Sequence, residues 1–179
     1  FEICGIVSLS GNVGLDITVN NALLCKELND RPEIPVLAGS AKPLCRPART
    51  AAYVHGKSGL GKHVEAYATL PVSDENAAEF AARMARKYDG ALEVVSLGPL
   101  TDVARAFRLR PEIRDRLTVV WIGGGEYPKG GAEYNLWNDI PAARLVFESD
   151  LTVWQVPRNA YGEVVVSLAE LEDKVYPCG

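Results

Sequence analysis

Short apolar runs alternate with amphipathic stretches along the whole sequence. The apolar runs are rich in β-branched residues and end at glycine, proline or polar residues, a pattern typical of buried strands. On this basis we predict strands over Ile3–Leu9, Ile34–Ala38, Leu92–Leu97, Leu117–Ile122 and Leu151–Val156.

The stretches between these runs carry helix signals. Apolar residues recur there at helical spacing, and capping residues or proline mark the ends. We predict a helix capped by Asp16 that ends before Arg31-Pro32, one capped by Ser73 or Asp74 that runs to about Tyr88, one after the turn Gly98–Thr101, one over Pro141–Ser149, and a last short one opened by the capping box Ser167…Glu170.

This alternation of strands and helices extends over the whole length. It implies βαβ units with right-handed crossovers, and hence an α/β fold with a mostly parallel open sheet flanked by helices. The sequence shows no internal repeat, linker or low-complexity tract, so residues 1–179 form a single domain.

Composition narrows the possible partners. The chain has 179 residues, 47% of them hydrophobic, with a net charge of −4. The charge argues against a nucleic-acid polymer, and no apolar run approaches the length of a membrane span. Arg105–Arg116 holds five arginines, but acidic residues dilute them, so we interpret the segment as a solvated helix end rather than a phosphate-binding patch.

The cysteines are scattered and form no CxxC motif. They give no metal-ligand spacing, and disulfides are not expected in so core-rich a chain, which favours a cytoplasmic location. The sequence begins with Phe1 in an apolar run, its only methionine is Met84, and no signal-peptide pattern opens it. We therefore expect a piece of a longer translation product.

The clearest candidate for a ligand site follows the run Leu117–Ile122. Gly123-Gly124-Gly125 stops the run, and Glu133-Tyr134-Asn135 comes shortly afterwards. Glycines let the backbone turn sharply and approach a ligand closely, and ligands of α/β sheets bind beyond the carboxyl ends of strands. A carboxylate, a ring and an amide in one short loop suit a polyhydroxylated ligand such as a sugar. An ordinary solvated loop is the alternative.

Other chemistries have weaker support. Gly56–His63 comes close to a P-loop, but His63 replaces the hydroxyl residue and no buried strand precedes the segment. No serine elbow, HExxH or strand-linked GxGxxG is present. His55 lies in this glycine-rich loop, where its ring could face a ligand or have a structural role.

Taken together, four stretches resemble the inosine–uridine-preferring nucleoside hydrolase family, in the same order and over nearly the whole chain. They are Gly11-Asn12-Val13, Val54-His55-Gly56-x-Ser58-Gly59-Leu60-Gly61, Leu97–Ala104 (LGPLTDVA) and Gly123-Gly124-Gly125…Glu133-Tyr134-Asn135…Asp139. The resemblance implies a Rossmann-like fold, incomplete at both ends, and a chain that is the central part of a longer enzyme of nucleoside salvage.

The resemblance also implies a reaction and a site. The family are hydrolases (glycosidases) that split ribonucleosides into ribose and base with bound calcium, whose ligands are oxygens. It assigns the ribose hydroxyls to Asn12, Glu133 and Asn135, with Tyr134 between the last two. It assigns calcium to the backbone carbonyl of Thr101. It places His55, the catalytic candidate of this chain, beside ribose and base, and it suggests a homo-oligomer, a dimer or tetramer.

Departures from the family pattern qualify these expectations. The aspartate cluster of the family's first strand and a C-terminal calcium-binding aspartate do not occur in this sequence, and Gly130 or Gly131 replaces a ribose-binding asparagine. We therefore expect the 179-residue chain alone to be inactive on nucleosides. The alternatives are a non-catalytic ribose- or nucleoside-binding domain and a purely structural α/β module.

Overall fold

The computed structural model describes residues 1–61 and 67–178. Its strands are β1 (Ile6–Ser8), β2 (Val36–Ala38), β3 (Leu92–Ser96), β4 (Leu117–Ile122) and β5 (Thr152–Val156). Its α-helices are α1 (Leu15–Leu28), α2 (Ala52–His55), α3 (Ala77–Tyr88), α4 (Thr101–Leu109), α5 (Tyr134–Asn138), α6 (Ile140–Phe147), α7 (Arg158–Tyr161) and α8 (Leu168–Lys174). Two 3-10 helices, η1 (Pro111–Arg116) and η2 (Tyr176–Cys178), complete the described elements.

The strands are parallel, as predicted, but they form two sheets rather than one. β1 pairs with β2, and β4 lies between β3 and β5. An apolar cavity of about 80 Å³ lies between the sheets and is lined by Val7 of β1 and Val94 of β3, among others. The two parts are linked at their carboxyl ends, where the Ser40 N–H donates to Asp102 Oδ2 over 3.0 Å. The α/β class is thus confirmed, and the single sheet is corrected to two.

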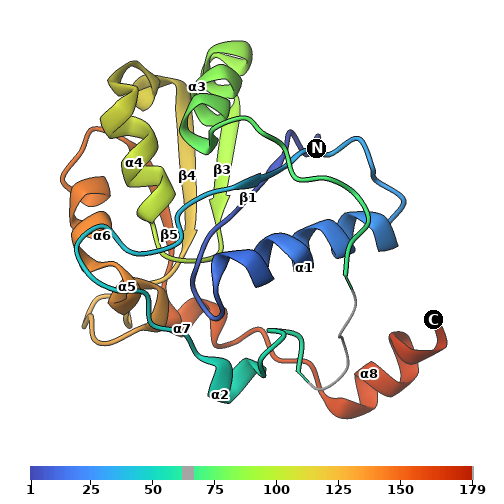
Figure 1. The fold of residues 1–179 in the computed structure, drawn as a ribbon. Coiled ribbons are helices and arrows are strands. Elements are labelled where there is room, and N and C mark those ends of the chain that lie inside the picture. The colour runs from blue at the N-terminus through green and yellow to red at the C-terminus, as the bar shows by residue number, and fades with distance from the viewer. Residues whose placement is uncertain (62–66, 179) are drawn as a thin grey trace.

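The main core lies between the three-stranded sheet and helices α3, α4 and α6, which cover one side of it (Figure 1). Leu117, Val119 and Trp121 of β4 are buried, and the residues between them are half-buried. On the other face, Val95 and Trp154 are 58% and 64% exposed. One face of this sheet therefore supplies most of the packing. Helix α1 packs on the smaller sheet.

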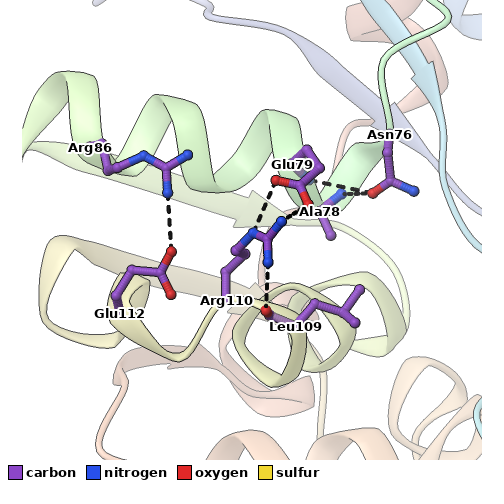
Figure 2. A network of polar contacts seen from close by, with 7 residues as sticks. All are labelled: Asn76, Ala78, Glu79, Arg86, Leu109, Arg110 and Glu112. Carbon is purple, nitrogen blue, oxygen red and sulfur yellow. Dashed lines mark hydrogen bonds and ion pairs between the residues drawn. The ribbon is translucent and has the colours of Figure 1, made fainter.

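Ion pairs join α3 to the end of α4 and to η1 (Figure 2). Arg110 binds Glu79, with 3.0 Å between its Nε and Oε2, and Arg86 Nη1 lies 3.0 Å from Glu112 Oε1. Arg116 pairs with Asp89. The arginine-rich segment is therefore a partly exposed helix end, as the sequence indicated, and two of its five arginines, Arg110 and Arg116, are paired with acids.

The capping residues agree only in part with the prediction. The capping box of Ser167 and Glu170 is confirmed. Helix α1 begins after Gly14 without a side-chain cap, so the assignment of Asp16 was wrong. Helix α3 is capped by Asn76, whose Oδ1 accepts from the Ala78 N–H over 2.9 Å.

Helix α8 lies apart from the sheets and their covering helices (Figure 1). Its side chains are mostly exposed, as are Val164, Val165 and Val166 before it. Among the described residues, no helix combines the length and apolar character that crossing a membrane requires.

The Asn76 cap can be tested by substitution. Replacing Asn76 with Ala leaves the first N–H groups of α3 without their side-chain acceptor and should lower the free energy of unfolding by about 1 kcal/mol in urea denaturation. The exposed Asp74, which the sequence offered as the cap, is the matched control. Asp74→Ala should change stability by less than about 0.5 kcal/mol. The reverse order of effects would contradict the assignment.

Candidate functional site

The loops that follow the strands meet at one end of the sheets. The Ser10 N–H donates to the Ser40 carbonyl over 2.9 Å, which joins the loops after β1 and β2. The Ala51 N–H donates to the Asn12 carbonyl over 2.7 Å. This end of the sheets is where α/β proteins bind ligands, so Asn12 lies in the expected region. Its side chain is exposed.

Glu133 is held by the protein on both of its carboxylate oxygens. Oε2 accepts from the N–H groups of Gly124 (2.8 Å) and Leu136 (3.0 Å), and Oε1 accepts from the Asn135 N–H (3.1 Å). The Tyr161 hydroxyl donates to Oε1 over 3.4 Å. Glu133 is only 8% exposed, and four donors fill the capacity of a carboxylate. It therefore caps α5 and fixes the glycine turn, and its contact with a ribose hydroxyl stays a prediction.

Asn135 joins the ends of two strands. Its Nδ2 donates to the carbonyl of Ile122 over 2.9 Å and to that of Leu97 over 3.3 Å. No described residue donates a hydrogen bond to its Oδ1, and the residue is half-buried. Asn135 is thus oriented by the protein through its amino group, and its oxygen is the group left to accept a ligand hydroxyl.

Tyr134 faces the protein rather than solvent. Its hydroxyl is buried, without a hydrogen-bond partner of normal geometry in the described part of the chain. Burial raises the pKa of this hydroxyl, the amide of Asn138 partly offsets the rise, and Tyr53 adds to it. The ring lies 6.1 Å from that of Trp137. A direct contact between Tyr134 and a ribose is therefore still a prediction.

Thr101 and Asp139 form the most buried polar contact of the site. Thr101 Oγ1 donates to Asp139 Oδ2 over 2.7 Å, and the two residues are 2% and 1% exposed. Asp139 also accepts from the N–H groups of Leu44 (2.9 Å) and Ala142 (3.1 Å). One carboxylate thus fixes the loop after β2, the start of α4 and the start of α6. The sequence motif contained Asp139 but assigned it no role. Its position just before a proline-containing helix was the available signal.

His55 ends α2 and is half-buried. Its carbonyl accepts from the Gly61 N–H over 2.9 Å, which closes the turn over residues 56–61. A short helix, not a buried strand, precedes this turn, and that context does not suit a P-loop. Lys62 and His63 lie outside the described residues.

The glycines of the run Gly123-Gly124-Gly125 lie close to other parts of the protein. A Cβ on Gly124 would collide with the Gln155 side chain, and Gly124 has φ +86°. A Cβ on Gly125 would collide with the backbone of Gly130 and Gly131. The sequence predicted a need for small residues here, and the structure shows that this need comes from packing against Gln155 of β5 and against the backbone of the loop itself.

The described residues do not assemble a calcium site. No group of three histidine, cysteine, aspartate or glutamate side chains gathers among residues 1–61 and 67–178. Calcium takes six to eight oxygen ligands, and the Thr101 carbonyl would supply one of them. The nearby carboxylate of Asp139 is already occupied by three protein donors. The fit of these residues to calcium is therefore incomplete.

The Asp139 contacts predict a stability effect. In Asp139→Asn one oxygen becomes an amino group that faces a donor, so we expect the free energy of unfolding to fall by about 2 to 3 kcal/mol. Urea denaturation measures this loss. Asp150 is exposed, and Asp150→Asn should stay within about 0.5 kcal/mol of the parent. Equal stability of Asp139→Asn and the parent would contradict the role of Asp139.

Tyr161 predicts a pH effect. Burial, followed by the charge of Glu133 and its hydrogen bond, raises the pKa of Tyr161. Its contribution to stability is therefore present below the unfolded pKa of about 10 and is lost as the pH rises through the folded pKa. Tyr161→Phe should weaken this alkaline loss in urea denaturation at several pH values. Tyr67→Phe, at an exposed tyrosine, should leave it unchanged.

The chain matches known proteins over most of its length. A probable uridine nucleosidase from Oryza sativa subsp. japonica is 37% identical over 169 residues, which are 91% of this chain and 52% of the relative. A pyrimidine-specific ribonucleoside hydrolase from Salmonella schwarzengrund is 32% identical over 175 residues, with 96% and 56% covered. The chain spans about half the length of the curated relatives it matches.

A solved structure and a family profile complete the comparison. A purine-preferring ribonucleoside hydrolase from Gardnerella vaginalis superposes with a TM-score of 0.89 at 27% identity, over 96% of this chain and 57% of the other. The sequence profile described as inosine-uridine preferring nucleoside hydrolase matches residues 1–176. The chain therefore belongs to the inosine–uridine-preferring nucleoside hydrolase family.

Proposed function

We propose that the whole protein hydrolyses the N-glycosidic bond of ribonucleosides and that this chain supplies the part that holds the ribose. The family match over residues 1–176 carries the proposal, because it includes all the candidate site residues. Relatives are named for pyrimidine and for purine substrates, and the ribose and the bond to be broken are common to both. We therefore propose a ribonucleoside as the substrate class.

The arrangement of Asn135 supports a specific role in this reaction. Cleavage builds positive charge on the sugar ring, as in other glycoside hydrolyses, and hydrogen bonds to the ring hydroxyls strengthen in that state. Asn135 Oδ1 would accept from a ribose hydroxyl while Nδ2 stays fixed on the Ile122 and Leu97 carbonyls. A group held in this way loses little freedom when the ligand binds.

Glu133 and Asn12 would then have different roles, because Glu133 orders the loop whereas Asn12 would contact the sugar directly. Glu133 shapes the loop through its four protein donors, and a direct contact with a hydroxyl would require it to exchange one of them. The exposed Asn12 side chain lies in the neighbouring loop and would bind a second hydroxyl. We propose His55 as the residue nearest to the base. The N–H of Ala51, just before the helix that His55 ends, donates to the Asn12 carbonyl, so His55 follows the segment that is joined to the Asn12 loop.

Release of ribose from inosine and uridine by the whole protein tests the proposal. Asn135→Ala should lower kcat/KM at least about tenfold, because it removes an interaction that is strongest in the transition state. Asn29 is the matched control, since its Nδ2 also donates to a backbone carbonyl, that of Cys25 over 2.7 Å, but on the exposed end of α1. Asn29→Ala should retain the parent kinetics.

Two results would change the conclusion. Unchanged kinetics in Asn135→Ala would remove Asn135 from the site. Calorimetric binding of ribose by a whole protein that hydrolyses neither nucleoside would select the non-catalytic ribose-binding alternative.

A further inference from the structure

Two arginines lie on one tryptophan ring beside the candidate site. The Cζ atoms of Arg46 and Arg49 are 4.7 Å and 5.3 Å from the centroid of the Trp137 ring, within the range of cation–π contacts. Trp137 belongs to α5, the short helix that also carries Asn135, and is 38% exposed. Two guanidinium groups therefore lie against the same side chain.

Arg46 is fixed there from a second side. Its Nε donates to the carbonyl of Asn138 over 3.0 Å. Its Nη2 is buried and finds no acceptor in the described part of the chain. Buried donors without an acceptor are rare in folded proteins and indicate a group that completes them.

The charges of Arg46 and Arg49 are also unbalanced. Neither arginine forms an ion pair with a carboxylate of residues 1–61 or 67–178, whereas Arg110 and Arg116 are paired with Glu79 and Asp89. Like charges on one ring repel each other, and partial burial strengthens that repulsion. An anion bound at this place would remove the repulsion and supply the missing acceptor.

The number and shape of the donors indicate which anion. Planar guanidinium groups bind the oxygens of carboxylates and phosphates in pairs. A carboxylate would balance one of the two positive charges, whereas a phosphate dianion would balance both and has more oxygens for the additional donors. We propose that Arg46 and Arg49 form a binding site for a phosphate dianion, either free or as the ester group of a small molecule.

The position of the site suggests how an ester could bind. Trp137 lies two residues after Asn135, and the segment that carries Arg46 and Arg49 leads directly to Ala51, which binds the Asn12 carbonyl. A phosphorylated ribose could therefore reach both the arginines and the amides. This extension to an ester rests on the proposed function, while the site for the phosphate group does not.

Calorimetric titration of the whole protein with inorganic phosphate, at fixed ionic strength, tests the proposal. The parent should bind phosphate, and Arg49→Gln and the double variant Arg46→Gln/Arg49→Gln should each weaken binding at least about tenfold, as expected for a lost charge-assisted contact. Arg144→Gln is the matched control, because Arg144 is exposed on α6 and lies 3.8 Å from Glu148. It should retain the parent affinity. Circular dichroism checks that Arg46→Gln, which loses the contact to Asn138, is folded.

Further titrations separate the ligand sources. Equal affinity for phosphate and ribose 5-phosphate identifies free phosphate as the ligand, whereas tighter binding of ribose 5-phosphate identifies the ester. Absence of phosphate binding by the parent, retention of binding in Arg49→Gln, or binding of acetate as tight as that of phosphate would overturn the proposal. Phosphate binding should survive Asn135→Ala, so failure of the ribose site and failure of this site give different results.

Discussion

The buried carboxylate of Asp139 is the contact on which the geometry of this site most depends. A carboxylate that is 1% exposed is costly unless its oxygens are hydrogen-bonded. Asp139 meets this requirement with donors from Leu44, Thr101 and Ala142, which belong to three different segments. Those segments follow β2, β3 and β4, so one side chain sets the relative positions of three loops. The surfaces that these loops present to a ligand follow from that arrangement.

Glu133 has the same role at the start of the preceding helix, α5. Its carboxylate accepts from the glycine turn, from the start of α5 and from Tyr161. Both acids are thus used as acceptors for the protein's own N–H and O–H groups. The amides differ from them, because Asn135 is held by its amino group and keeps its oxygen for another donor. The acids order the loops, and the amides are the better candidates for direct ligand contact.

The sequence predicted the strands well because each depends on local composition. The β-branched run Leu117–Ile122 is a strand over the predicted residues, and the capping box of Ser167 needs only a neighbour three residues away. Contacts between distant segments were not predictable in this way. Leu44 and Asp139 are 95 residues apart, and nothing in either local sequence indicates that they meet. The division of the sheet and the contact of Arg46 with α5 were not predictable for the same reason, because they also depend on residues far apart in the sequence.

The glycine run shows a local inference that the folded structure explains through packing. Small residues are required after β4, and the sequence indicated this. The segments that approach them are the side chain of Gln155 and the backbone of Gly130 and Gly131, which only the folded loop brings together. In α5 and the loop beside it, the Asn135 oxygen has no donor and two guanidinium groups have no carboxylate partner among the described residues. A neutral acceptor next to a cationic pair suits a ligand that carries both hydroxyl groups and negative charge.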